Sequence, residues 1–95
     1  MTITLIIQFQ VKPEKLAEFS AILATVKNEL PGKGGCKAMR VLQGADDPHA
    51  ITLVEEWASR ALHHSHFEAI VASGDWNHIQ THLAAAPVSQ YYNEL

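Results

Sequence analysis

The chain has 95 residues, of which 47% are hydrophobic and 18% are charged, and its formal net charge is −3. A chain of this length forms one domain, so residues 1–95 are expected to fold as a single unit. The negative charge argues against nucleic acid as a partner, because phosphate binding requires a basic surface.

The first residues and the cysteine count indicate where in the cell the protein is found. The opening segment MTITLIIQF is too short to span a membrane and lacks the basic start of a signal peptide, so no membrane partner is expected. Cys36 is the only cysteine, which excludes an internal disulfide and favours a reduced, cytoplasmic setting.

A strand followed by a helix is predicted for the first third of the chain. Apolar and polar residues alternate over residues 2–11, which is typical of a strand with one strongly apolar face. Pro13 suits the first turn of a helix, and apolar residues then recur at spacings of three and four as far as Leu30. Pro31 and Gly32 end this helix.

The middle of the chain predicts an antiparallel hairpin. Residues 36–43 and 50–57 have the composition of strands, and the segment GADDPH between them is a dense turn signal. In the second of these strands Ile51 and Leu53 face one side and Val54 the other. Apolar residues on both faces indicate a sheet that is covered on both sides.

Two further helices and a strand are predicted for the remainder. Ser59 is a suitable N-cap for a helix through about Ala72, and the pair Ser73-Gly74 interrupts it. Asp75 can cap a further helix through about Ala85, before residues 88–93 form a closing strand. The resulting order is α+β and ferredoxin-like, βαββαβ, with an antiparallel sheet and its helices on one face. The other face then needs a partner, and a homodimer formed by two such sheets is the simplest expectation.

Several short motifs carry a family resemblance. They are KPEKLAEF in the first helix, the pair Gly35-Cys36, the D-D-P turn, the E-x-W end of the third strand and the A-P-x-S-x-Y-Y close. With these motifs the chain resembles the antibiotic biosynthesis monooxygenase domain family, small proteins of the dimeric α+β barrel superfamily.

The resemblance implies a cofactor-independent monooxygenase that oxidises a small aromatic, anthrone-like or quinol-like substrate with molecular oxygen, without metal or flavin. The substrate anion would reduce oxygen itself, so the protein need only bind the substrate, take a proton and stabilise the anion. The pocket is expected between the helices and the sheet, at the level of Trp57. A dimeric module that binds a small hydrophobic ligand without catalysis is the alternative.

Trp57, His63 and His66 are the candidate catalytic residues. The indole N–H of Trp57 can donate to a substrate oxygen, whereas its structural interpretation is a core residue that pins a helix to the sheet. Either histidine can act as a base near neutral pH, or simply face solvent. Helical spacing groups His63 and His66 with Ile70, and His64 with Phe67 and Val71, so that at most two histidines share one pocket. Arg60, Phe67 and Tyr91 are predicted to bind the substrate.

Two other polar groups allow alternative interpretations. Glu55 and Glu56 point to opposite faces of their strand, so one is predicted to be a buried acid or an ion-pair partner of Arg40, and the other a dimer contact. His78 and His82 are four residues apart, the spacing of bis-histidine metal sites, but no third ligand is evident and no metal is predicted.

The chain also departs from the family pattern. The polyketide-oxidising members carry an asparagine shortly before the tryptophan, where this chain has LVEE. The haem-degrading branch needs an asparagine in the first strand, and residues 2–11 contain none.

Overall fold

A computed structural model describes residues 2–95 and contains one four-stranded antiparallel sheet. Its strands are β1 (Ile3–Gln10), β2 (Cys36–Gln43), β3 (Ala50–Trp57) and β4 (Val88–Tyr92), arranged in the order β2-β3-β1-β4. The two central strands, β1 and β3, are therefore not neighbours in the sequence. This order is the ferredoxin-like one that the sequence predicts.

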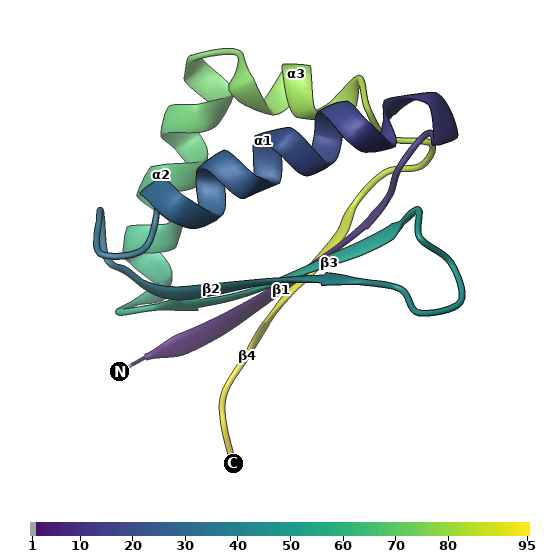
Figure 1. Cartoon of the computed structure of the whole chain (residues 1–95). Coiled ribbons are helices and arrows are strands. Elements are labelled where there is room, and N and C mark those ends of the chain that lie inside the picture. Colours follow the sequence, from purple (N-terminus) through teal and green to yellow (C-terminus); the bar gives the residue numbers. More distant parts are fainter. Residues whose placement is uncertain (1) are drawn as a thin grey trace.

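All helices lie on one side of this sheet (Figure 1). A single 3-10 turn, η1 (Pro13–Lys15), leads into α1 (Leu16–Glu29), and the hairpin is followed by α2 (Arg60–Ala72) and α3 (Asp75–Gln80). Ser59 caps α2 as predicted, because its hydroxyl accepts a hydrogen bond from the Leu62 backbone N–H at 3.2 Å. Gly74, with a φ of +87°, makes the sharp turn between α2 and α3.

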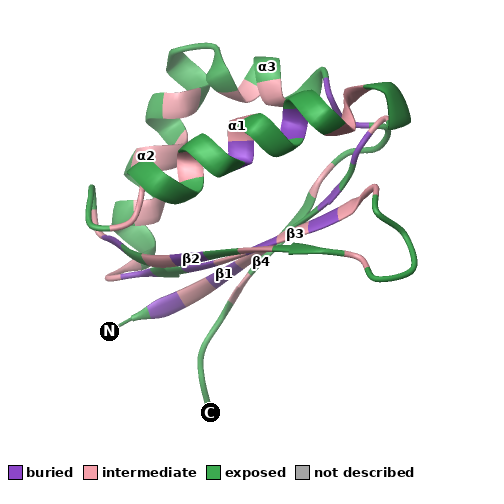
Figure 2. Ribbon diagram, viewed as in Figure 1, coloured by how far each residue is buried: buried purple, intermediate pink, exposed green. Residues whose placement is uncertain are grey.

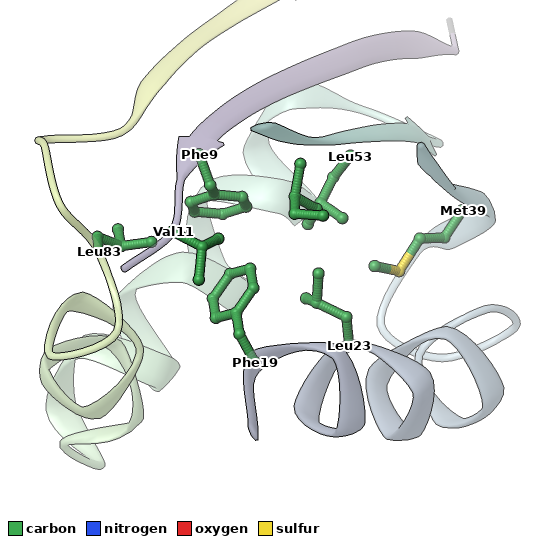
Figure 3. Close-up of a cluster of buried hydrophobic side chains, with 8 residues drawn as sticks. Phe9, Val11, Phe19, Leu23, Met39, Leu53 and Leu83 are labelled. Atoms are coloured by element: carbon green, nitrogen blue, oxygen red, sulfur yellow. The ribbon is translucent and has the colours of Figure 1, made fainter. Parts of the chain in front are cut away.

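The main hydrophobic core lies where α1 packs on the sheet (Figure 3). Antiparallel pairing places Phe9 opposite Ile51, and the Phe9 ring meets the edge of Phe19 from α1, with ring centroids 5.2 Å apart. Leu23 extends this contact one turn further along the helix. These residues share a core because strand alternation and helical spacing direct them to the same interior.

A second, smaller core lies toward the other end of the sheet. It consists of Ile3, Leu5, Cys36 and Trp57. By contrast, α2 has no buried residue. Ile7, which points to the helix side between the two cores, is only partly buried. The space between α2 and the middle of the sheet is therefore incompletely filled.

The face of the sheet away from the helices is not covered by any other element among residues 2–95 (Figure 2). Ile6 and Val54 are paired across β1 and β3 on this face, and Leu42, Val88 and Tyr92 are exposed. The apolar residues that the sequence places on both sides of the sheet are thus present, but helices cover one side only.

The last helix is shorter than predicted. α3 ends at Gln80 rather than near Ala85, because the chain after it pairs with the end of β1. Leu83 forms an isolated bridge with Val11, and the Ala84 N–H donates to the Gln10 carbonyl at 2.8 Å. These long-range hydrogen bonds replace the helical ones that the local sequence favours.

Candidate functional site

A cavity of about 500 Å³ lies between the helices and the sheet. Its floor is formed by β1 and β3, including Ile7 and Leu53, and its walls by α1, α2 and α3. The lining is mainly apolar, and Phe67 and Trp76 form an aromatic wall with ring centroids 5.1 Å apart and planes at 71°. This volume falls within the range of sites that bind small organic ligands.

Few ionisable side chains reach this cavity. Glu55 comes from β3, His63 and His66 come from α2, and Asp75 and His78 come from α3. Glu55 is 5% exposed, whereas Asp75 and His78 are exposed. The buried end of the cavity therefore combines one carboxyl group with two imidazoles.

Glu55 is held by the tryptophan two residues further along its own strand. The Trp57 indole N–H donates to Glu55 Oε1 at 2.8 Å, in a buried hydrogen bond. Burial raises the pKa of Glu55, and this hydrogen bond opposes the shift. The predicted ion pair with Arg40 is wrong, because Met39 lies opposite Glu55 in the sheet, while Arg40 lies opposite Val54 and is exposed.

Trp57 lies next to the cavity but is separated from it by other residues. It is fully buried, it does not line the cavity, and its only N–H is occupied by Glu55. Its ring packs against His63 and His66, with centroids 5.1 and 5.2 Å away. In the structure the indole N–H donates to a neighbouring carboxyl group. The sequence interpretation proposes a substrate oxygen as its acceptor.

His63 and His66 lie together on the inner face of α2, as their spacing predicts. Burial, together with the neighbouring His66 and His64, lowers the pKa of His63 to about 4. Burial also lowers the pKa of His66. Both imidazoles are consequently neutral at neutral pH, so each has one nitrogen that can accept a proton and one N–H that can donate a hydrogen bond. His63 Nδ1 lies 2.5 Å from the Tyr91 hydroxyl.

The remaining predicted residues are divided between the cavity and its surroundings. Phe67 lines the cavity next to His63, not on the face of His64. His64 is exposed, and its Nε2 lies 3.0 Å from Glu68 Oε1. Arg60 and Tyr91 are not among the cavity-lining residues; the Arg60 guanidinium carbon lies 4.6 Å from the centre of the Tyr91 ring.

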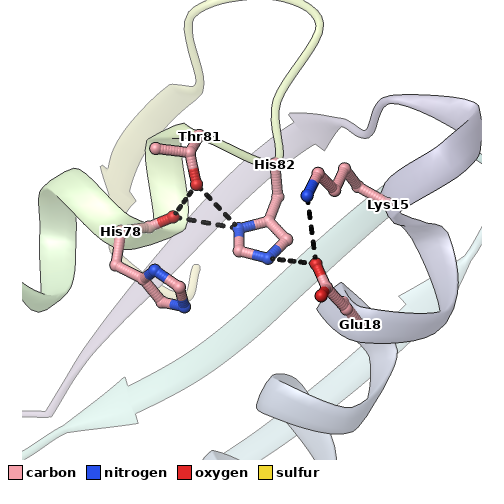
Figure 4. Close-up of polar contacts among 5 residues, drawn as sticks. All are labelled: Lys15, Glu18, His78, Thr81 and His82. Atoms are coloured by element: carbon pink, nitrogen blue, oxygen red, sulfur yellow. Dashed lines mark hydrogen bonds and ion pairs between the residues drawn. The ribbon is translucent and has the colours of Figure 1, made fainter.

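His78 and His82 take part in a set of contacts within the protein (Figure 4). His82 is buried, and its Nδ1 lies 2.9 Å from the His78 carbonyl oxygen while its Nε2 lies 3.2 Å from Glu18 Oε2. Both ring nitrogens are thus engaged within the protein. Within residues 2–95 no cluster of three or more potential ligands is present. This pair connects α3 to α1 instead.

Strand alternation predicts that either Glu55 or Glu56 is a buried acid, and the structure shows that it is Glu55. The α3 residues of the cavity are the part of the site that sequence reasoning missed. Glu55 and Trp57 are two residues apart on one strand, so they necessarily point the same way, and this parity was sufficient to predict their contact. No sequence signal distinguishes a core residue from a cavity wall.

The fold and the site define a small α+β protein with an apolar, histidine-bearing ligand cavity between its helices and its sheet. The chain belongs to the antibiotic biosynthesis monooxygenase family, whose model matches residues 2–85. A search of curated proteins finds no match. Among residues 2–95, no helix is both long enough and apolar enough to cross a membrane.

Solved structures of similar fold cover almost the whole chain. A conserved protein from Methanosarcina mazei Go1 has a TM-score of 0.87 and 23% identity, covering 100% of this chain and 94% of its own. Rv0793 from Mycobacterium tuberculosis has a TM-score of 0.86 and 17% identity, with 100% and 96% covered. SnoaB, a cofactor-independent oxygenase from Streptomyces nogalater, has a TM-score of 0.81 and 12% identity, with 98% and 92% covered. At these identities the likeness concerns the fold.

Proposed function

We propose that this protein is a cofactor-independent monooxygenase that oxidises a small aromatic or quinol-like substrate with molecular oxygen. The observation that carries the proposal is the apolar cavity of about 500 Å³ in which two neutral imidazoles and a buried carboxyl group meet. Membership of the monooxygenase family supports it. So does the shared fold of SnoaB, a cofactor-independent oxygenase.

The shape and polarity of the cavity favour a flat, largely uncharged substrate. Phe67 and Trp76 offer ring edges and faces to an aromatic molecule. The carboxyl and imidazole groups lie beside Trp57, and the Phe67 ring of the aromatic wall is next to His63. A substrate would therefore place its acidic O–H or C–H group there and its hydrocarbon part along the aromatic wall.

His66 is the proposed base. It lines the cavity, burial keeps it neutral at neutral pH, and the described residues give its ring nitrogens no hydrogen-bond partner. Proton transfer from the substrate to His66 leaves an electron-rich anion. This anion passes one electron to O₂, and the resulting substrate radical and superoxide combine through a new C–O bond. Cleavage of the O–O bond then releases water, so that a CH₂ group and O₂ become C=O and H₂O.

A homodimer is part of the proposal. The open face of the sheet carries Leu42, Val88 and Tyr92, all exposed in the single chain. Pairing of two such faces would remove this apolar surface from water, giving the dimeric α+β barrel. Sedimentation measurements test this directly: Val88→Lys should give a monomer, because it places a charge on the exposed apolar face that is proposed to pair.

Oxygen consumption tests the reaction. An oxygen electrode should record uptake with at least one member of a panel of quinols and anthrones. His66→Gln should lower kcat by about a hundredfold, within the range expected for loss of a general base. His64→Gln is the matched control, because His64 lies on the same helix but faces solvent, and it should leave kcat unchanged. An equal loss of activity in both variants would contradict the assignment of His66 as the base.

A non-catalytic module that binds a small hydrophobic ligand is the second candidate. The observation that favours it is the lack of an asparagine among the cavity-lining residues, since Leu53 and Glu55 occupy this part of β3. Native mass spectrometry of the gently purified protein would then show a retained apolar ligand. Flat oxygen traces across the panel, together with such a ligand, would favour this function over oxidation.

A further inference from the structure

One ring nitrogen of His63 contacts another side chain of the protein, and among residues 2–95 the other ring nitrogen has no such contact. Its Nδ1 lies 2.5 Å from the Tyr91 hydroxyl, and Tyr91, on β4, does not line the cavity. The two rings meet edge to face, with centroids 5.4 Å apart. Nε2 is therefore the polar atom that His63 can offer to a bound molecule.

The hydrogen bond between Tyr91 and His63 has a preferred direction. His63 is neutral at neutral pH, so one ring nitrogen carries a proton and the other accepts. A phenol is a better donor than acceptor, and an unprotonated imidazole nitrogen is a good acceptor. The Arg60 guanidinium carbon, 4.6 Å from the Tyr91 ring centre, draws electron density from that ring and strengthens this preference. The Tyr91 O–H thus donates to Nδ1.

We infer that Tyr91, backed by Arg60, is a positioning residue that fixes His63 as the Nε2–H tautomer, so that His63 presents an N–H donor to the cavity. The hydrogen bond at one ring nitrogen determines the proton position at the other. This inference rests on the proposed function for its chemical meaning: the donor would hold the negatively charged oxygen of the deprotonated substrate. It also separates the two histidines, since His66 takes the proton and His63 stabilises the charge that remains.

The tautomer can be measured without any substrate. In protein labelled with ¹⁵N-histidine, two-bond ¹H–¹⁵N correlation spectra distinguish the Nε2–H tautomer from the Nδ1–H tautomer and from an averaged mixture. Wild-type His63 should show Nε2–H alone at neutral pH, and Tyr91→Phe should convert it to a mixture. Tyr92→Phe is the matched control, because Tyr92 is adjacent in sequence but lies on the open face. A wild-type Nδ1–H tautomer, or an unchanged spectrum in Tyr91→Phe, would overturn the inference.

Activity measurements on His63 variants distinguish a hydrogen-bond donor from a general base. Glutamine can donate an N–H but cannot take a proton at neutral pH. His63→Gln should therefore keep kcat within about tenfold of the wild type, whereas His63→Leu should lower it by about a hundredfold, as loss of an oxyanion donor does. Equal losses in both variants would contradict the donor role. Flat oxygen traces for the wild type would instead refute the proposed function, and the spectra would still decide the tautomer.

Discussion

Replacing Trp57 by phenylalanine tests the buried contact that organises the site. The indole N–H donates to Glu55 Oε1 at 2.8 Å, and both side chains are almost inaccessible to water. A hydrogen bond to a charged group contributes about 1.5–3 kcal/mol, and a neutral one about 1 kcal/mol. Loss of the larger ring from a packed site adds on the order of 1–2 kcal/mol. Trp57→Phe should therefore lower the free energy of unfolding by about 2–3 kcal/mol where Glu55 is protonated and by up to about 5 kcal/mol where it is ionised.

A double-mutant cycle separates the hydrogen bond from the packing. Trp57→Phe, Glu55→Leu and the double variant are compared by urea unfolding, followed by circular dichroism. Because the packing losses cancel in the cycle, the coupling energy should be about 1 kcal/mol where Glu55 is protonated. It should rise toward about 1.5–3 kcal/mol where Glu55 is ionised. A coupling energy near zero at both ends of the pH range would refute the reasoning.

Three further predictions concern the turn before β2, the α3 contact and pH. Gly35→Ala should destabilise the protein by about 2 kcal/mol or more, because an added Cβ would lie 2.6 Å from Leu62 Cδ1; Gly32→Ala, also at positive φ but in open space, should cost only about 1 kcal/mol. Thermal unfolding compares the two. His82→Ala should cost about 2–4 kcal/mol in urea unfolding, since it removes a buried ring and its hydrogen bonds; a loss below about 0.5 kcal/mol would exclude the contact with α1. The pKa of Glu55 is raised above 4.5 by burial, so the folded state holds this proton more tightly. Stability should therefore fall as pH rises from about 4.5 through the folded pKa, and Glu55→Gln should abolish that fall.

The strands and the first two helices were predictable because their signals are local. Alternation over residues 2–11 and the cap at Ser59 depend on neighbours in sequence, and both agree with the structure. The end of α3 was not predictable in this way, because the bridge between Leu83 and Val11 joins distant segments. Here the pairing with a distant strand determines the structure, and the helical propensity of the local sequence does not.

In the candidate site, too, the features that follow from local sequence were predictable and those that depend on tertiary distances were not. The shared face of His63 and His66 follows from helical spacing, and both line the cavity. The partner of the Trp57 indole follows from strand parity with Glu55. What the sequence does not contain is the distance between α2 and the sheet, since the same apolar residues would fill a closed core. That distance determines whether Phe67 is a core residue or a cavity wall.

The lack of buried residues in α2 bears on how a ligand enters. A helix with no fully buried side chain loses little apolar contact when it lifts from the sheet, so its opening requires only a small part of the free energy of global unfolding. We therefore expect α2, which supplies both histidines, to be the element that moves when a ligand enters the cavity. Its backbone amides would exchange with solvent faster than those of β1 and β3, and a bound molecule, by bridging α2 to the sheet, would slow that exchange.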